Sequence, residues 1–155
     1  MQNNPFATGA GQSAIFGTLL IVVLIACVIM LLPAIFYMLT LQKALDRCSP
    51  ENQAMAPGMV WLMFIPLFGL AWHFVIVLNL AKSLGAEFSK RRISAEPNPG
   101  RDLGLVMCIL GCCDLIPHLR LPFSLGFIAC WIVYWVKIAG FSSKLAGAPP
   151  VQSAA

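Results

Sequence analysis

The chain has 155 residues, of which 59% are hydrophobic and only 10% are Asp, Glu, Lys or Arg. Its mean hydropathy is +0.84, whereas a typical soluble domain carries about 25% charged residues. This composition excludes an ordinary soluble domain and predicts one compact domain in a lipid bilayer. In such a protein the net charge of +4 reflects loops on one side of the membrane and does not indicate nucleic-acid binding.

Four apolar segments follow one another along the chain. About 20 apolar residues at a rise of 1.5 Å cross a hydrocarbon layer of about 30 Å, so a long charge-free run predicts a membrane span. The predicted order is a mobile N-terminus over residues 1–13, spans at 14–41, 57–80, 103–117 and 121–141, and a disordered tail at 145–155. Pro33 predicts a kink in the first span. The predicted fold is an all-α, polytopic four-helix membrane bundle over residues 14–144.

Short similarities between spans suggest a variant of this fold. The second and fourth spans end in LNLAKSL and VKIAGFSSKL, and the first and third contain LLPAIFY and LIPHLRL. These matches leave open two similar helical hairpins related by an axis along the membrane normal, as in transporters with parallel repeats.

Loop charges predict the orientation of the spans. With both termini in the cytoplasm, three basic residues (Lys43, Arg47 and Arg120) lie on the far side. The cytoplasmic side then holds the other seven, which are Lys82, Lys90, Arg91, Arg92, Arg101, Lys137 and Lys144. The positive-inside rule favours this arrangement. We interpret Lys90, Arg91 and Arg92 as topology determinants that also attract anionic lipid, and Trp131, Trp135 and Lys137 as an interfacial anchor.

Polar residues inside the apolar segments are the candidates for chemistry. Asp114 is the only acid in an apolar run, and His118 follows four residues later, so a continuing helix would present both on one face. Such a pair suits proton transfer. We favour a structural interpretation, in which Asp114 lies at the lipid headgroups and pairs with His118 or Arg120. His73 is expected to hydrogen-bond to a neighbour, and Asn79 to a facing helix.

The third span combines small residues with thiols. Gly104, Cys108, Gly111 and Cys112 predict a thin face against which another helix packs closely. The alternative is a soft-metal site that adds Cys113, Asp114 and His118, or a haem site at His73. We favour packing, and we expect no cofactor.

A resemblance covers roughly residues 41–145. The segment with Pro50, Asn52, Met55, Pro57, Gly58, Val60, Trp61 and Leu62, the Ile65–Phe68 stretch and the late Tyr134–Ile138 stretch resemble a group of small uncharacterised bacterial multi-span proteins. This resemblance implies a four-span protein of the bacterial inner membrane and transfers no activity. An Arg often follows the Asn in that group, and this chain has Gln53 instead.

Three functions remain open from the sequence. The motifs G-x-x-x-x-G-K-[ST], H-E-x-x-H and G-x-S-x-G do not occur in the chain, so we do not expect an enzyme. The leading hypothesis is a subunit or scaffold that packs in the bilayer against other membrane proteins or against itself. The alternatives are a small transporter or channel component that uses Asp114 and His118, and a haem- or metal-binding membrane protein.

Overall fold

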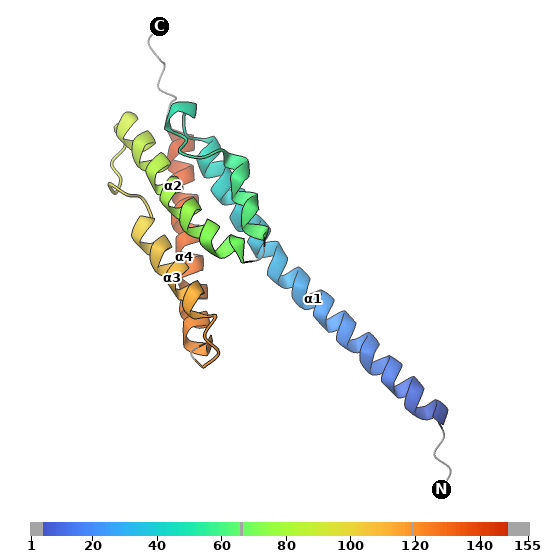
Figure 1. Cartoon of the computed structure of the whole chain (residues 1–155). Helices are drawn as coiled ribbons and strands as arrows, with labels where there is room; N and C mark the ends of the chain where they lie inside the picture. The colour runs from blue at the N-terminus through green and yellow to red at the C-terminus, as the bar shows by residue number, and fades with distance from the viewer. Residues whose placement is uncertain (1–4, 66, 119, 149–155) are drawn as a thin grey trace. The chain divides into compact units, whose positions relative to one another are not determined.

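The computed structural model describes residues 5–65, 67–118 and 120–148, and every regular element in these ranges is helical. The elements are α1 (Pro5–Asp46), η1 (Pro50–Asn52), η2 (Pro57–Phe64), α2 (Phe68–Lys90), α3 (Arg101–Cys113) and α4 (Arg120–Gly147) (Figure 1). The predicted all-α class is therefore confirmed. Three described helices, over Gln12–Asp46, Phe68–Lys90 and Arg120–Gly147, are long and apolar enough to cross a membrane.

The chain divides into two units within α1. The first ends at Phe36 and the second begins at Tyr37. The first unit is helical from Pro5 onward, so the N-terminus predicted to be mobile is helical in its described part, and residues 1–4 lie outside the description. Proline suits the first turn of a helix, and propagation adds one hydrogen bond per residue once a helix exists. Pro33 lies inside α1, which continues through it.

The second unit has a core between the last turns of α1 and the helices α2, α3 and α4 (Figure 1). Leu41 and Leu45 of α1, Leu80 of α2, Met107 of α3 and Ile138 of α4 are completely buried. Each of these helices therefore supplies an apolar face to one common centre, which is the arrangement that removes most apolar surface from the surroundings.

The range predicted as one span at residues 57–80 folds as a hairpin instead. The 3₁₀ helix η2 ends at Phe64, and α2 begins at Phe68 after Leu67, which has φ 64°. Ala54 N–H donates to Ser83 Oγ (2.9 Å) and Trp72 Nε1–H donates to Met59 O (2.8 Å), so the chain from residue 54 runs back along α2. A proline in a helix interior lacks an N–H and clashes with the preceding turn, and Pro66 occupies the break, outside the described residues.

Glycine is required where this hairpin closes. A Cβ on Gly69 would lie 2.1 Å from the carbonyl oxygen of Met63, so only glycine allows the first turn of α2 to pack against η2. The remaining predicted spans have different outcomes. The predicted 121–141 span lies within α4, whereas α3 has 13 residues, about 20 Å at 1.5 Å per residue, which is shorter than a hydrocarbon layer.

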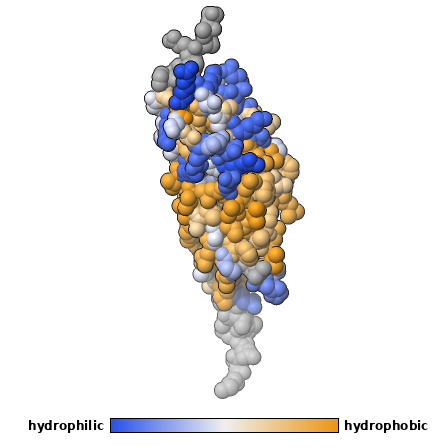
Figure 2. Space-filling model, turned by 90° about the vertical axis from the view of Figure 1, so that its left-hand side faces the viewer, coloured by the Kyte–Doolittle hydropathy of each residue, from blue (hydrophilic) through white to orange (hydrophobic). Residues whose placement is uncertain are grey.

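The C-terminal ends of three helices meet at one end of the second unit. Arg47, just after α1, donates from Nη1 to Ser142 O and Oγ on α4, each at 2.6 Å. Arg91, just after α2, donates to Arg47 O at 3.1 Å. Arg47 and Arg91 are therefore neighbours, which contradicts the sequence-based assignment of these residues to opposite membrane sides. The reason is that η2 and α2 form a hairpin, which brings the end of α2 back to the end of α1. Figure 2 shows hydrophilic residues gathered toward one end and hydrophobic residues below them.

Candidate functional site

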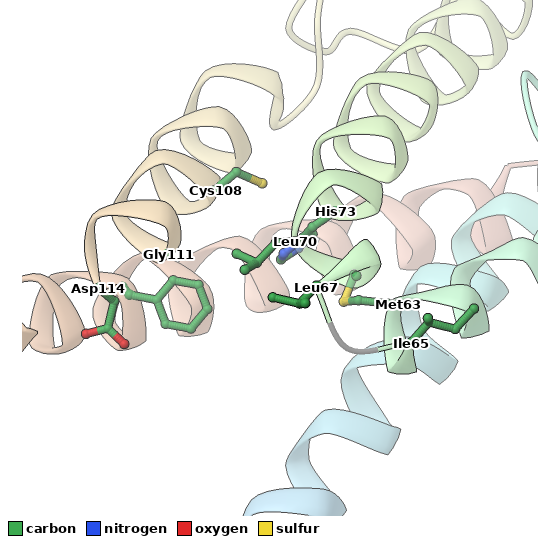
Figure 3. A pocket seen from close by; sticks show the side chains of 10 residues that line it. Met63, Ile65, Leu67, Leu70, His73, Cys108, Gly111 and Asp114 are labelled. Carbon is green, nitrogen blue, oxygen red and sulfur yellow. The ribbon is translucent and has the colours of Figure 1, made fainter. Parts of the chain in front are cut away.

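A hollow of about 340 Å³ lies beside the start of α2. Its lining includes four residues that the sequence singled out, which are His73, Cys108, Gly111 and Asp114. The rest is apolar, with Leu67 and Leu70 among the lining residues. The hollow combines an apolar wall with a few polar groups, which is the usual composition of a small-molecule site. Figure 3 shows His73 near Leu70, with the carboxylate of Asp114 on the α3 side and apart from the imidazole.

His73 is anchored by a tyrosine that sequence reasoning missed. His73 and Tyr37 are both buried, and Tyr37 Oη and His73 Nε2 are 2.9 Å apart. The ring centroids of Trp131 and Trp135 lie 5.4 Å and 6.3 Å from that of Tyr37. The expectation that His73 hydrogen-bonds to a neighbour is met by Tyr37. The only sequence signal for Tyr37 was a hydroxyl within an apolar run.

The tryptophans predicted as an interfacial anchor pack inward on one side. Trp131 and Trp135 are half-buried, and Trp135 Nε1–H donates to Thr40 Oγ1 at 2.9 Å. These contacts tie α4 to the last turns of α1, and aromatic pairs of this kind contribute about 0.5–1.5 kcal/mol beyond their buried area. Lys137 lies two residues after Trp135 and pairs with Glu96, at 2.8 Å. Hydrogen bonding to Lys137 lowers the pKa of the Glu96 carboxyl.

Asp114 follows the last turn of α3 and does not form the predicted pair with His118. The helix ends at Cys113, so the spacing of four residues no longer places the two side chains on one helical face. In the described part of the chain, no hydrogen bond or ion pair joins Asp114 to His118 or to Arg120, and Asp114 Oδ1 is buried without a hydrogen-bond partner. A buried oxygen without a partner is costly and is unusual in a folded protein.

Gly104 and Gly111 of α3 face α2 and α4, whereas Cys112 of the predicted small-residue face does not pack there. A Cβ on Gly104 would lie 2.5 Å from Val77 Cγ1 and 2.9 Å from Tyr134 Cε2, so this glycine permits the close approach of three helices. Cys108 is buried and Cys112 is exposed. Among the described residues, no three His, Cys, Asp or Glu side chains are grouped as they would be around a metal ion.

A buried carboxylate that the sequence analysis did not single out holds the polar end together. Glu87 is completely buried and accepts four hydrogen bonds. Ser49 donates from N and Oγ at 3.0 Å each, Asn52 donates from Nδ2 at 2.7 Å, and Arg91 donates from Nε at 2.6 Å. The spacing Glu87 to Arg91 is the ordinary i,i+4 helical pair, and this was the available signal.

The basic cluster Lys90, Arg91 and Arg92 separates into three different environments. Arg91 is part of the Glu87 network and also donates to Leu145 O at 3.0 Å. Lys90 forms an ion pair with Glu51. Arg92 is exposed and has φ 54°. The structure thus uses Arg91 to connect the helix ends, because its planar guanidinium can serve several acceptors at once.

The polar residue Asn79 lies half-buried on α2 and does not line the hollow.

Comparisons of the chain with protein-family models, with curated proteins and with solved structures found no match.

Proposed function

We propose that this chain is a non-enzymatic, multi-pass membrane protein that serves as a subunit or scaffold and packs against other membrane proteins or against itself. The proposal is based on the exposed apolar side chains of the first unit. The most apolar stretch of the helix over Gln12–Asp46 has none of its residues buried, and Phe16 and Met30 are 70% and 75% exposed. A helix that is apolar on all sides needs lipid or other helices around it.

A face of small side chains on this helix supports helix association. Ala14 and Thr18 lie one turn apart, and Thr18 Oγ1–H donates to Ala14 O at 2.9 Å, so its hydroxyl is satisfied within the helix. A Cβ on Gly17 would meet no described atom within 4 Å. Small residues at this spacing let two helix backbones approach closely in a membrane, where packing rather than the hydrophobic effect drives association.

Substitution of Gly17 tests the proposal. Gly17→Leu fills the small face, whereas Ala26→Leu adds a comparable side chain nine residues later, on the opposite side of the helix. We expect Gly17→Leu to reduce self-association or the recovery of co-purifying membrane proteins in mild detergent, and Ala26→Leu to preserve it. A wild-type protein that is strictly monomeric and free of partners would refute the proposal.

We further propose that the polar end of the second unit lies on the cytoplasmic side of a bacterial inner membrane. The whole of α2 is long enough to cross a membrane, but its charge-free part, residues 68–81, is about 21 Å long, less than the ~30 Å of a hydrocarbon layer. The hairpin would therefore enter and leave on one side. Lys43, Arg47, Lys90 and Arg91 would then share the cytoplasmic side, in agreement with the positive-inside rule.

This orientation replaces one sequence-based expectation. The C-terminus stays cytoplasmic, but a single crossing by the apolar part of α1 would leave the N-terminus on the other side. Phosphatase and fluorescent-protein fusions at each terminus test this. We expect phosphatase activity only from the N-terminal fusion, and a cytoplasmic signal from both termini would restore the earlier arrangement.

A second candidate function, a small transporter or channel component, is favoured by the unpartnered Oδ1 of Asp114 beside the hollow. Irregular backbone at membrane depth is tolerated where it lines a cavity, and Leu67 of the hairpin turn lines this one. Asp114→Asn should abolish proton or solute flux in proteoliposomes while the protein inserts normally. Unchanged flux would remove this candidate.

A further inference from the structure

A second hollow, of about 270 Å³, lies between α2 and the segment that leads into α3. Lys82 and Ala86 of α2 form one side, and Asn98 and Arg101 form the other. A Cβ on Gly85 would lie 3.0 Å from Pro97 O, so the two sides are held in close contact at this point. The shape of the hollow is thus fixed by the fold.

Two basic side chains of this hollow lack ion-pair partners. Lys82 and Arg101 are exposed, and neither forms an ion pair with a described residue. Three acids near the polar end are engaged elsewhere, since Glu51, Glu87 and Glu96 pair with Lys90, Arg91 and Lys137. Asp102, next to Arg101, is in the first turn of α3, where the helix dipole already favours a carboxylate.

The hollow lies where the charged end of the second unit meets its apolar part. Lys82 follows the charge-free stretch of α2, and Arg101 precedes the apolar stretch of α3. Val75 and Leu78 are 36% and 42% exposed and lie on the same α2 face as Lys82, seven and four residues earlier. An anionic group in the hollow would therefore have an apolar track directly below it.

From this arrangement we propose that Lys82 and Arg101 bind the headgroup phosphate of an anionic phospholipid, whose acyl chains lie along Val75 and Leu78. The proposal rests on the membrane position argued above. Basic pockets between helices at a membrane boundary bind anionic headgroups. Two basic side chains from different elements fix the position of a bound phosphate better than one. The volume suits the phosphate and glycerol of a headgroup, with the chains outside.

The test is lipid binding to the full chain in mild detergent, measured by native mass spectrometry with phosphatidylglycerol and phosphatidylcholine. The double variant Lys82→Gln/Arg101→Gln should lose roughly 30-fold in affinity for phosphatidylglycerol, since each base near a membrane surface contributes roughly a factor of five. The matched control Lys43→Gln/Arg120→Gln removes the same charge from exposed positions outside the hollow and should lose less than about threefold.

Each other outcome is informative. The variant Lys82→Arg/Arg101→Lys keeps both charges and should retain lipid binding. Circular dichroism of the helices shows whether Lys82→Gln/Arg101→Gln remains folded. If this double variant unfolds, the single variant Lys82→Gln should lose about fivefold in affinity for phosphatidylglycerol. Equal losses in both double variants, or equal affinity for phosphatidylcholine, would refute the site. Displacement of the lipid by inorganic phosphate at equal concentration would show that the ligand is free phosphate and would overturn the lipid assignment.

Failure of this proposal can be told apart from failure of the proposed function. Resistance of the wild-type protein to extraction from membranes by alkaline carbonate reports membrane integration and does not depend on Lys82 or Arg101. Loss of the protein into the carbonate supernatant would refute both proposals. A retained protein whose lipid binding ignores the Lys82 and Arg101 substitutions would refute the lipid site alone.

Discussion

Glu87 offers the sharpest test of how the helix ends are held together. In Glu87→Gln one carboxylate oxygen becomes an NH₂ group. Oε1 accepts from Ser49 Oγ and Arg91, and Oε2 accepts from Ser49 N and Asn52. Either orientation of the amide therefore turns its NH₂ toward a group that can only donate, Ser49 N–H or Arg91 Nε–H, and Arg91 loses its counter-charge. Because Glu87 is 0% exposed, bulk water does not compensate for these losses.

The expected cost is large for so small a change. Removing one partner of a buried ion pair costs about 3–5 kcal/mol in total, and this figure includes the about 1–3 kcal/mol of the buried donor left unsatisfied. At about 2–4 °C per kcal/mol for a chain of this size, the apparent Tm should fall by about 10 °C. Thermal unfolding of the purified protein in detergent, followed by circular dichroism, measures this shift.

Glu51→Gln is the matched control for Glu87→Gln. Glu51 also pairs with a basic residue of α2, Lys90, but its side chain is 65% exposed, and exposed pairs contribute at most about 1 kcal/mol. A second check is Arg91→Met in the Glu87→Gln background, which should cost less than the sum of the two single changes because the pair acts as a unit. Equal Tm losses for Glu87→Gln and Glu51→Gln would refute the reasoning.

Two further predictions concern packing and reactivity. Gly104→Ala should lower the free energy of unfolding by about 1–3 kcal/mol, because its Cβ would overlap Val77 and Tyr134. The control Gly140→Ala should be neutral or slightly stabilising, because its Cβ would meet nothing within 4 Å. Denaturant titrations measure both variants, and equal effects would contradict this prediction. Burial raises the pKa of the Cys48 thiol to about 12. Because only the thiolate reacts, modification of Cys48 by a maleimide at pH 8 should be about 1000-fold slower in the folded protein than after unfolding. Peptide mass spectrometry measures the two rates, and similar rates would show an accessible thiolate.

The sequence predicted best where local properties decide the outcome. The helices that contain residues 14–41 and 121–141 follow from long apolar runs, since in a bilayer every backbone N–H and C=O must be satisfied within the segment. The break in the 57–80 range was visible only as Pro66, a residue type that kinks some membrane helices and ends others. Whether η2 and α2 form one helix or a hairpin depends on contacts such as Trp72 to Met59, which are distant in sequence.

The sequence by itself determined that the chain is all-helical and apolar enough for a membrane, because composition and hydropathy are sums over residues that need no partner. Only the tertiary structure decided which polar groups meet. It joined Tyr37 to His73, gave Glu87 its four donors, and separated Asp114 from His118 by ending α3 at Cys113. The reason is physical: a buried polar group is stable only with a partner, and the partner's identity depends on how distant segments pack.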